Sequence, residues 1–156
     1  MEKKINIVLN DITTVFFDVD GIFTDGSLYL SDDGVGITKF NVHDGMGCIL
    51  LKEIGVEILI LTARHSEAVI SRFKSLGINK IFTNTLKKKD FIKNYSKLNN
   101  LDKKEIAMMG DDLQDLATVD EVGIFFTSPN AIDSVKDRAD YITKKFGGNG
   151  AVREIC

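Results

Sequence analysis

The chain has 156 residues, a formal net charge of −3 at pH 7 and 44% hydrophobic residues. This length suits one α/β domain, so we expect a single domain over residues 1–156. The acidic balance argues against nucleic acid as a partner, because phosphate backbones require a concentrated basic surface. The sequence has no apolar run of the ~20 residues that a membrane span needs and no signal-peptide core, which predicts a cytoplasmic protein without a membrane partner. Cys48 and Cys156 are expected to be free thiols.

Short apolar runs alternate with segments of helical periodicity along the chain. The runs cover residues 15–17, 57–61, 80–82, 106–109 and 123–126, and the helical segments cover 47–54, 66–76, 89–98 and 113–119. Gly55 and Gly77 are expected to end two of these helices. Such alternation is typical of βαβ units and predicts an α/β fold with a parallel sheet.

Residues 27–41 interrupt this alternation. They contain two short alternating runs around Asp32, Asp33 and Gly34, which is the pattern of a β-hairpin. Because this insertion follows the first strand directly, we expect it to project over the carboxyl end of that strand.

Polar side chains that carry chemistry follow several of the apolar runs. Ligands of open parallel sheets bind beyond the carboxyl ends of the strands, so these positions are the candidates for a site. Each residue alone has a simpler interpretation as a turn, a helix cap, a strand-end hydroxyl or a surface lysine. Their occurrence at one edge of one sheet favours function. The candidates are Asp18, Asp20, Thr62, Arg64, Lys89, Asp111, Asp112 and Asp115.

These residue types are the ones that phosphoryl transfer requires. Mg²⁺ prefers oxygen ligands such as carboxylates from two strand ends. A carboxylate can attack phosphorus to form an acyl phosphate, and a second acid can protonate the leaving oxygen. A lysine and a hydroxyl can stabilise the charge of the transferring group. A calcium-binding EF-hand loop does not fit, because Gly21 is the fourth residue of a loop that begins at Asp18, whereas an EF-hand has its glycine at the sixth position.

The order of these motifs resembles that of the haloacid dehalogenase-like phosphatases. Residues 18–24 (DVDGIFT) are similar to the first motif of that family, Thr62 to the second, Lys89 to the third and residues 110–115 to the fourth. The resemblance implies a Rossmann-like three-layer sandwich in which a small β-hairpin replaces the cap domain.

The same resemblance implies a role for each candidate. Asp18 would be the nucleophile and Asp20 the general acid and base. Asp18, the Asp20 carbonyl and Asp111 would bind Mg²⁺, with Asp112 and Asp115 supporting the metal site. Thr62 and Lys89 would bind phosphate.

Several further segments are similar to the 3-deoxy-D-manno-octulosonate (KDO) 8-phosphate phosphatases. They are residues 25–26, the hairpin, 39–47, 62–64 and above all 147–154 (GGNGAVRE). This resemblance implies an acidic sugar phosphate as substrate, a place in lipopolysaccharide biosynthesis, a homotetramer, and an Arg64 that binds the substrate carboxylate. Two features depart from the family: His43 stands where Arg is usual, and the sequence ends at Cys156 where relatives usually continue into a tail.

Three alternatives remain beside this interpretation. One is a phosphatase for a nine-carbon sialic-acid-type 9-phosphate, against which Arg64 argues. Another is a tetramerisation module related to domains fused to sugar cytidylyltransferases. A receiver domain also phosphorylates an Asp beside Mg²⁺, but its motifs occur in a different order.

Overall fold

A parallel sheet of six strands forms the centre of the molecule. The computed structural model describes residues 9–156. The strands lie in the order β5-β4-β1-β6-β7-β8 and all of their pairings are parallel. Their bounds are β1 Thr14–Phe17, β4 Glu57–Leu61, β5 Ile81–Phe82, β6 Ile106–Met109, β7 Ile124–Thr127 and β8 Tyr141–Ile142. The first strand of the chain is therefore central in the sheet.

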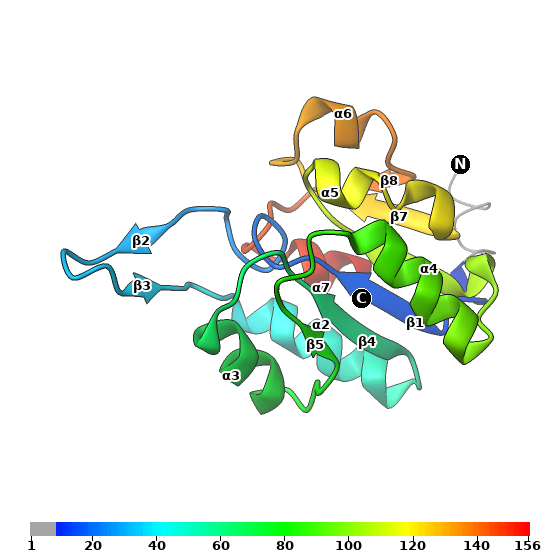
Figure 1. Cartoon of the computed structure of the whole chain (residues 1–156), viewed down its shortest axis with the longest axis horizontal. Helices are drawn as coiled ribbons and strands as arrows, with labels where there is room; N and C mark the ends of the chain where they lie inside the picture. The colour runs from blue at the N-terminus through cyan, green and yellow to red at the C-terminus, as the bar shows by residue number, and fades with distance from the viewer. Residues whose placement is uncertain (1–8) are drawn as a thin grey trace.

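Helices cover both faces of the sheet, which confirms the three-layer α/β architecture (Figure 1). One face packs against α2 (Val42–Glu53), α3 (Glu67–Ser75) and α7 (Ala151–Ile155). The other packs against α4 (Lys88–Asn99), α5 (Leu113–Leu116) and α6 (Asp133–Lys136). Two short 3₁₀ helices, η1 (Lys103–Glu105) and η2 (Val119–Glu121), precede β6 and β7.

The side chains of the central strands alternate between these two layers. Phe17 of β1 packs in the core beside α2 and α3, whereas its neighbour Phe16 packs in the core beside α4. Both rings are fully buried. Because successive strand residues point to opposite faces, a strand buried on both faces becomes a continuous apolar run. This is why these strands were recognisable in the sequence.

Local sequence signals mark the helix ends. Asn41 caps α2 by accepting a hydrogen bond from the His43 N–H at 2.8 Å, and Ser66 caps α3. Gly55 and Gly77 follow α2 and α3 with φ angles of 89° and 69°, which confirms them as helix stops.

The insertion forms the expected hairpin, with β2 (Tyr29–Leu30) antiparallel to β3 (Gly36–Ile37). It reaches away from the sheet, and only its base lies near the carboxyl end of β1 (Figure 1). Leu30 is 67% exposed and Ile37 66% exposed, so neither face of the hairpin is packed against another part of residues 9–156. Phe40 differs, since its ring packs against Phe73 of α3 at 6.1 Å between centroids.

The chain between 128 and 156 contains elements that the periodicity did not predict, namely β8, α6 and α7. The two helices have four and five residues and the strand has two, so none is long enough to show a period. No helix within residues 9–156 has the length and hydrophobicity to cross a membrane.

Candidate active site

Three neighbouring strands bring their following residues together at one edge of the sheet. Asp18 follows β1, Thr62 follows β4 and Asp111 lies two residues after β6. They line a hollow of about 300 Å³ at the carboxyl ends of the strands. Asp18 is held there by its backbone N–H, which donates to the Met109 carbonyl at 3.0 Å. These three residues therefore lie together at one edge of the sheet, as the sequence predicted.

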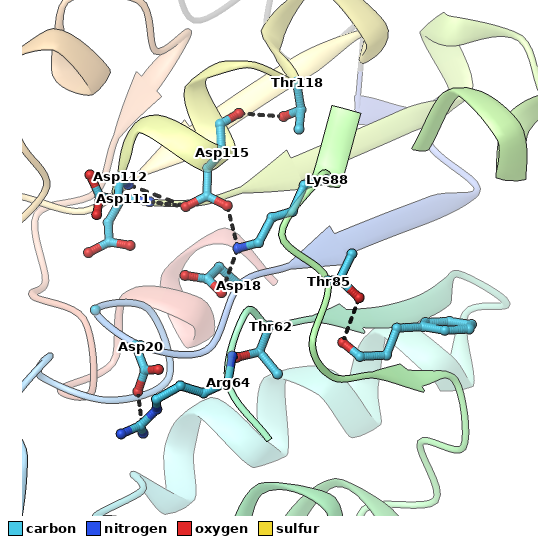
Figure 2. A network of polar contacts seen from close by, with 12 residues as sticks. Asp18, Asp20, Thr62, Arg64, Thr85, Lys88, Asp111, Asp112, Asp115 and Thr118 are labelled. Carbon is cyan, nitrogen blue, oxygen red and sulfur yellow. Dashed lines mark hydrogen bonds and ion pairs between the residues drawn. The ribbon is translucent and has the colours of Figure 1, made fainter. Parts of the chain in front are cut away.

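A buried lysine joins two carboxylates in this hollow. Lys88, the first residue of α4, places its Nζ 2.7 Å from Asp18 Oδ1 and 2.6 Å from Asp115 Oδ1 (Figure 2). The Lys88 side chain is 2% exposed and that of Asp115 1%. Charges this deeply buried require partners, so each member of this group depends on the others.

The raised pKa values of two carboxyl groups show that negative charge is in excess in this hollow. Burial and Asp115 raise the pKa of Asp18 to about 7, although Lys88 acts in the opposite direction. Burial and the neighbouring carboxylates, Asp18 first among them, raise the pKa of Asp111 to about 8. Burial by itself lowers the pKa of Lys88, but Asp18 and Asp115 outweigh it and the net pKa is raised. A further cation would relieve this repulsion.

The structure corrects the predicted lysine. Lys89 points away from the hollow, with its Nζ 3.6 Å from Glu121 Oε1 and its side chain 46% exposed. The helix begins one residue earlier than the expected segment, and its first residue, Lys88, faces Asp18. Successive residues of a helix are rotated by about 100°, so Lys88 and Lys89 cannot both face the hollow.

A capping box holds Asp111 and Asp112 in place. Asp112 begins α5, its Oδ1 accepting from the Leu113 N–H at 2.7 Å. Asp115 Oδ2 accepts from the N–H groups of Asp111 and Asp112 at 3.1 and 3.2 Å (Figure 2). Both oxygens of Asp115 are thereby engaged, since Oδ1 bonds Lys88. This arrangement suits Asp115 to support the site rather than to ligate a metal.

Glycine is required where the loop after β1 approaches Asp111. Gly21 has φ 78°, and a Cβ built on it would lie 1.9 Å from Asp111 Oδ2. The Asp111 carboxylate therefore lies directly over the backbone of the 18–21 loop.

The donor set fits a hard divalent cation. One oxygen each from Asp18, Asp111 and Asp115 lie within 4.8 Å of one another. Carboxylate oxygens are the ligands that Mg²⁺ prefers, and a cation would offset the repulsion that raises the two carboxyl pKa values. Because Asp115 already bonds Lys88 and two backbone amides, Asp18 and Asp111 are the carboxylates best placed to hold the ion.

Asp20 and Arg64 form a separate ion pair at the rim. Arg64 Nη2 donates to Asp20 Oδ1 at 3.0 Å, and the two side chains are 45% and 38% exposed. In Figure 2 the Asp20 carboxylate points toward Arg64 and away from Lys88. Both residues also line a second hollow of about 210 Å³, the rim hollow, whose other wall is the hairpin with its strands β2 and β3.

Thr62 is 2% exposed and lines the 300 Å³ hollow beside Asp18. Its Oγ1 accepts from the Arg64 N–H at 3.3 Å, which fixes the turn that places Arg64 at the rim. The strand end thus positions a hydroxyl inside the hollow and a guanidinium at its edge.

The 18–24 loop is also held by hydrogen bonds from two segments that were not predicted to belong to the site. Asn130 Nδ2 donates to the Gly21 carbonyl at 2.9 Å, and Asn130 Oδ1 accepts from the Gly147 N–H at 2.8 Å. The Gly148 N–H donates to the Ile22 carbonyl at 2.8 Å. Asn130 follows the end of β7, so the rule that found Asp18 and Thr62 would have found it had it been applied to the last apolar run.

The segment of residues 147–150 therefore packs against the loop after β1. A Cβ on Gly147 would lie 1.8 Å from the Gly21 carbonyl oxygen. The segment is anchored by Asp44 of α2, a buried carboxylate that accepts from the Gly150 and Arg153 N–H groups at 3.2 and 2.9 Å. Burial raises the pKa of Asp44 even though these amides act to lower it.

The remaining residues noted in the sequence lie outside the hollow. His43 is exposed in the first turn of α2. Cys48 is buried, Cys156 is partly buried, and both are free thiols as expected.

Comparison with known proteins identifies relatives over nearly the whole chain. Residues 75–155 match the model of the haloacid dehalogenase-like hydrolases. The KDO 8-phosphate phosphatase of Escherichia coli strain K12 is 34% identical over 148 residues, which cover 94% of this chain and 78% of that protein. The enzyme of the same name from Haemophilus influenzae is 33% identical over 147 residues, covering 94% and 82%.

The chain belongs to the haloacid dehalogenase-like hydrolases, in the family of the KDO 8-phosphate phosphatases. A solved structure of this family comes from Moraxella catarrhalis, in complex with a magnesium ion, a phosphate ion and KDO. It has a TM-score of 0.96 and 36% identity, and the match covers 100% of this chain and 90% of that chain. The predicted family, fold and enzyme class, a phosphoric monoester hydrolase, are confirmed.

Proposed function

We propose that this protein is a magnesium-dependent phosphatase that hydrolyses KDO 8-phosphate to KDO and phosphate. The observation that carries the proposal is the buried group of Asp18, Lys88 and Asp115 with Asp111 beside it, at the carboxyl end of the central strand. Family membership supports the same reaction, since the relatives named above carry this activity in their names.

The proposed roles follow from the residue types and from the one hollow that these side chains line. Asp18 attacks phosphorus, and the bond from phosphorus to the sugar oxygen breaks as the aspartyl-phosphate forms. Asp20 gives the leaving oxygen its proton and then takes one from the water that hydrolyses the intermediate. Lys88 holds Asp18 in place and, with Thr62, stabilises the phosphoryl oxygens.

Mg²⁺, held by Asp18, Asp111 and the Asp20 carbonyl, would supply the positive charge that phosphoryl transfer requires. Asp112 and Asp115 support this set through the capping box. Lys88 replaces Lys89 in the role first assigned to the latter, because only Lys88 faces the hollow.

The substrate is an acidic sugar phosphate on the route to lipopolysaccharide. Arg64 lies at the rim beside the second hollow, where its guanidinium can bind a carboxylate with two parallel hydrogen bonds. A nine-carbon sialic-acid-type 9-phosphate is the alternative with the same chemistry. We also propose a cytoplasmic location, in keeping with a reaction on a sugar phosphate.

The hairpin supports the proposal of a homotetramer. Leu28, Leu30 and Ile37 are 63%, 67% and 66% exposed in a hairpin whose two strands pair with no other strand in residues 9–156. An isolated hairpin is marginal in water, and exposed apolar patches mark interaction sites. Light scattering at micromolar concentration tests this, and a monomer with full activity would contradict it.

Phosphate release from a panel of sugar phosphates tests the function. With Mg²⁺, KDO 8-phosphate should be hydrolysed faster than neutral sugar phosphates, and EDTA should abolish the reaction until Mg²⁺ is restored. Full activity in chelator would refute the metal requirement. A higher kcat/KM for a nine-carbon acid sugar 9-phosphate would replace the substrate but retain the chemistry.

A further inference from the structure

The general acid proposed for the reaction is held by the residue proposed to bind the substrate. Asp20 Oδ1 accepts from Arg64 Nη2 at 3.0 Å, and among residues 9–156 Arg64 is the one side chain that bonds this carboxylate. The pair is drawn apart from the Asp18 and Lys88 group in Figure 2. A side chain that must protonate the leaving oxygen is thus turned toward the rim.

The pair lies between the two hollows. Asp20 lines both the hollow around Asp18 and Lys88, the catalytic hollow, and the rim hollow next to the hairpin, whereas Arg64 lines only the rim hollow. A substrate whose phosphate lies at Asp18 and whose sugar extends to the hairpin base must pass this pair. Its leaving oxygen needs Asp20, and its carboxylate needs Arg64.

The two demands compete for one guanidinium. A carboxylate binds an Arg fork best when it uses two N–H donors together, and Nη2 is occupied by Asp20. A second carboxylate brought to Arg64 also repels the first one, because like charges at this separation disfavour each other. The pair is about half exposed, so it is weak and can exchange partners without a large cost.

We propose that Arg64 restrains Asp20 until the carboxylate of an acid sugar takes the guanidinium, so that substrate recognition itself turns the general acid toward the reaction. The inference rests on the proposed function. Arg64 then favours acid sugars twice, by binding their carboxylate and by freeing Asp20 only when they are bound. Neutral sugar phosphates leave the pair intact and react with a misdirected general acid.

This model predicts effects of opposite sign for one substitution. The two substrates are KDO 8-phosphate and glucose 6-phosphate, both phosphate esters of primary sugar alcohols, of which only the first has a carboxylate. Arg64→Ala should lower kcat/KM for KDO 8-phosphate by roughly 30- to 1000-fold, the range for loss of a charged contact. It should raise kcat for glucose 6-phosphate by about two- to fivefold, the range for release of an exposed ion pair.

Two further variants make the test specific. Arg64→Lys retains a cation beside Asp20, so kcat for glucose 6-phosphate should remain at the wild-type value or below. Arg138→Ala breaks another exposed pair, with Asp120 at 3.4 Å. Neither residue lines either hollow, so the turnover of both substrates should be unchanged. Thermal melts of all variants establish that they are folded.

The outcomes separate the inference from the function on which it rests. An active wild type with an unchanged or lower kcat for glucose 6-phosphate in Arg64→Ala overturns the inference alone, leaving Arg64 as a carboxylate ligand. Equal losses on both substrates also overturn it, because Arg64 would then support the phosphate site. A wild type that turns over neither substrate with Mg²⁺ overturns the proposed function and the inference with it. A rise for glucose 6-phosphate together with a loss for KDO 8-phosphate supports the coupling.

Discussion

Two groups of charged residues meet at the carboxyl edge of the sheet, one inside the hollow around Asp18 and one at its rim, and they differ in how deeply they are buried. Lys88 is 2% exposed and bonds two carboxylates, whereas Arg64 is 45% exposed and bonds one. Removing one member of a buried group leaves an uncompensated charge in the interior. When one member of an exposed pair is removed, water hydrates the charge that remains. The buried group is therefore suited to hold a fixed arrangement, and the rim pair is suited to change with the ligand.

The largest expected effect comes from Asp18, the proposed nucleophile in the buried group. Asp18→Asn keeps the shape of the side chain but removes its nucleophilic oxygen, so phosphate release should fall by roughly 1000-fold or more. The circular dichroism spectrum should match that of the wild type. Phosphate release within about tenfold of the wild-type rate would place the chemistry elsewhere.

Lys88 and Lys89 offer a matched test of the buried group. In EDTA, Lys88→Gln should lower the free energy of unfolding by about 3–5 kcal/mol, because it leaves Asp18 and Asp115 facing each other without a cation. Lys89→Gln should change it by about 0.5 kcal/mol or less, since that side chain lies at the surface. Urea unfolding measures both. Equal effects would contradict the difference in burial.

The pH dependence of stability tests the excess of negative charge. The pKa of Asp111 is raised from 3.8 to about 8, so its contribution is complete below about pH 4 and is lost as the pH rises through 8. In EDTA, the melting temperature of the wild type should therefore fall between pH 4 and pH 8 relative to that of Asp111→Asn. One kcal/mol corresponds to roughly 2–4 °C in a domain of this size.

Mg²⁺ provides the control for that measurement. At pH 8 the ion should raise the melting temperature of the wild type and leave that of Asp111→Asn nearly unchanged, because the variant has lost a ligand. A gap between the two proteins that is constant across pH would mean that Asp111 is not held in a repulsive environment.

The smallest expected effect lies in the support behind the loop. Asn130→Ala removes the bonds to Gly21 and Gly147. It should lower kcat by about three- to tenfold, a total loss of about 1 kcal/mol, because Ser128 Oγ still donates to the Gly21 carbonyl at 3.3 Å. Asn99→Ala removes a similar bond, to the Tyr95 carbonyl, at the far end of α4 and is the control. Equal activities of the two variants would show that the loop keeps its position without Asn130.

The sequence predicted the site best where residue type and strand ends coincide. Asp18, Thr62 and Asp111 follow apolar runs whose side chains fill both layers of the core. Residues that follow such strands lie at the carboxyl edge of the sheet, so their location can be predicted without knowledge of tertiary contacts. The lysine was wrong by one position, since Lys87, Lys88 and Lys89 are chemically alike and only the start of α4 decides which of them faces Asp18.

Other features depend on contacts between distant parts of the chain. The partner of Asp20 lies 44 residues away, and that of Gly21 lies 109 residues away in Asn130. Neither pairing has a periodic signature. The segment of residues 147–150 was noted for its resemblance to a family, but its packing against Gly21 comes from the fold alone.

The contact of Gly147 and Gly148 with the loop after β1 has a consequence for synthesis of the protein. The ribosome makes Asp18 early, and every proposed catalytic side chain has been added once Asp115 has followed. The Ile22 carbonyl nevertheless gains its N–H partner only when Gly148 emerges. Contacts between distant parts of a chain cannot form until both parts have been made, so the nascent chain carries all of its proposed catalytic groups before Gly147 and Gly148 can pack against the 18–24 loop. Residues made late in synthesis thus supply the last contacts to a loop that was made early.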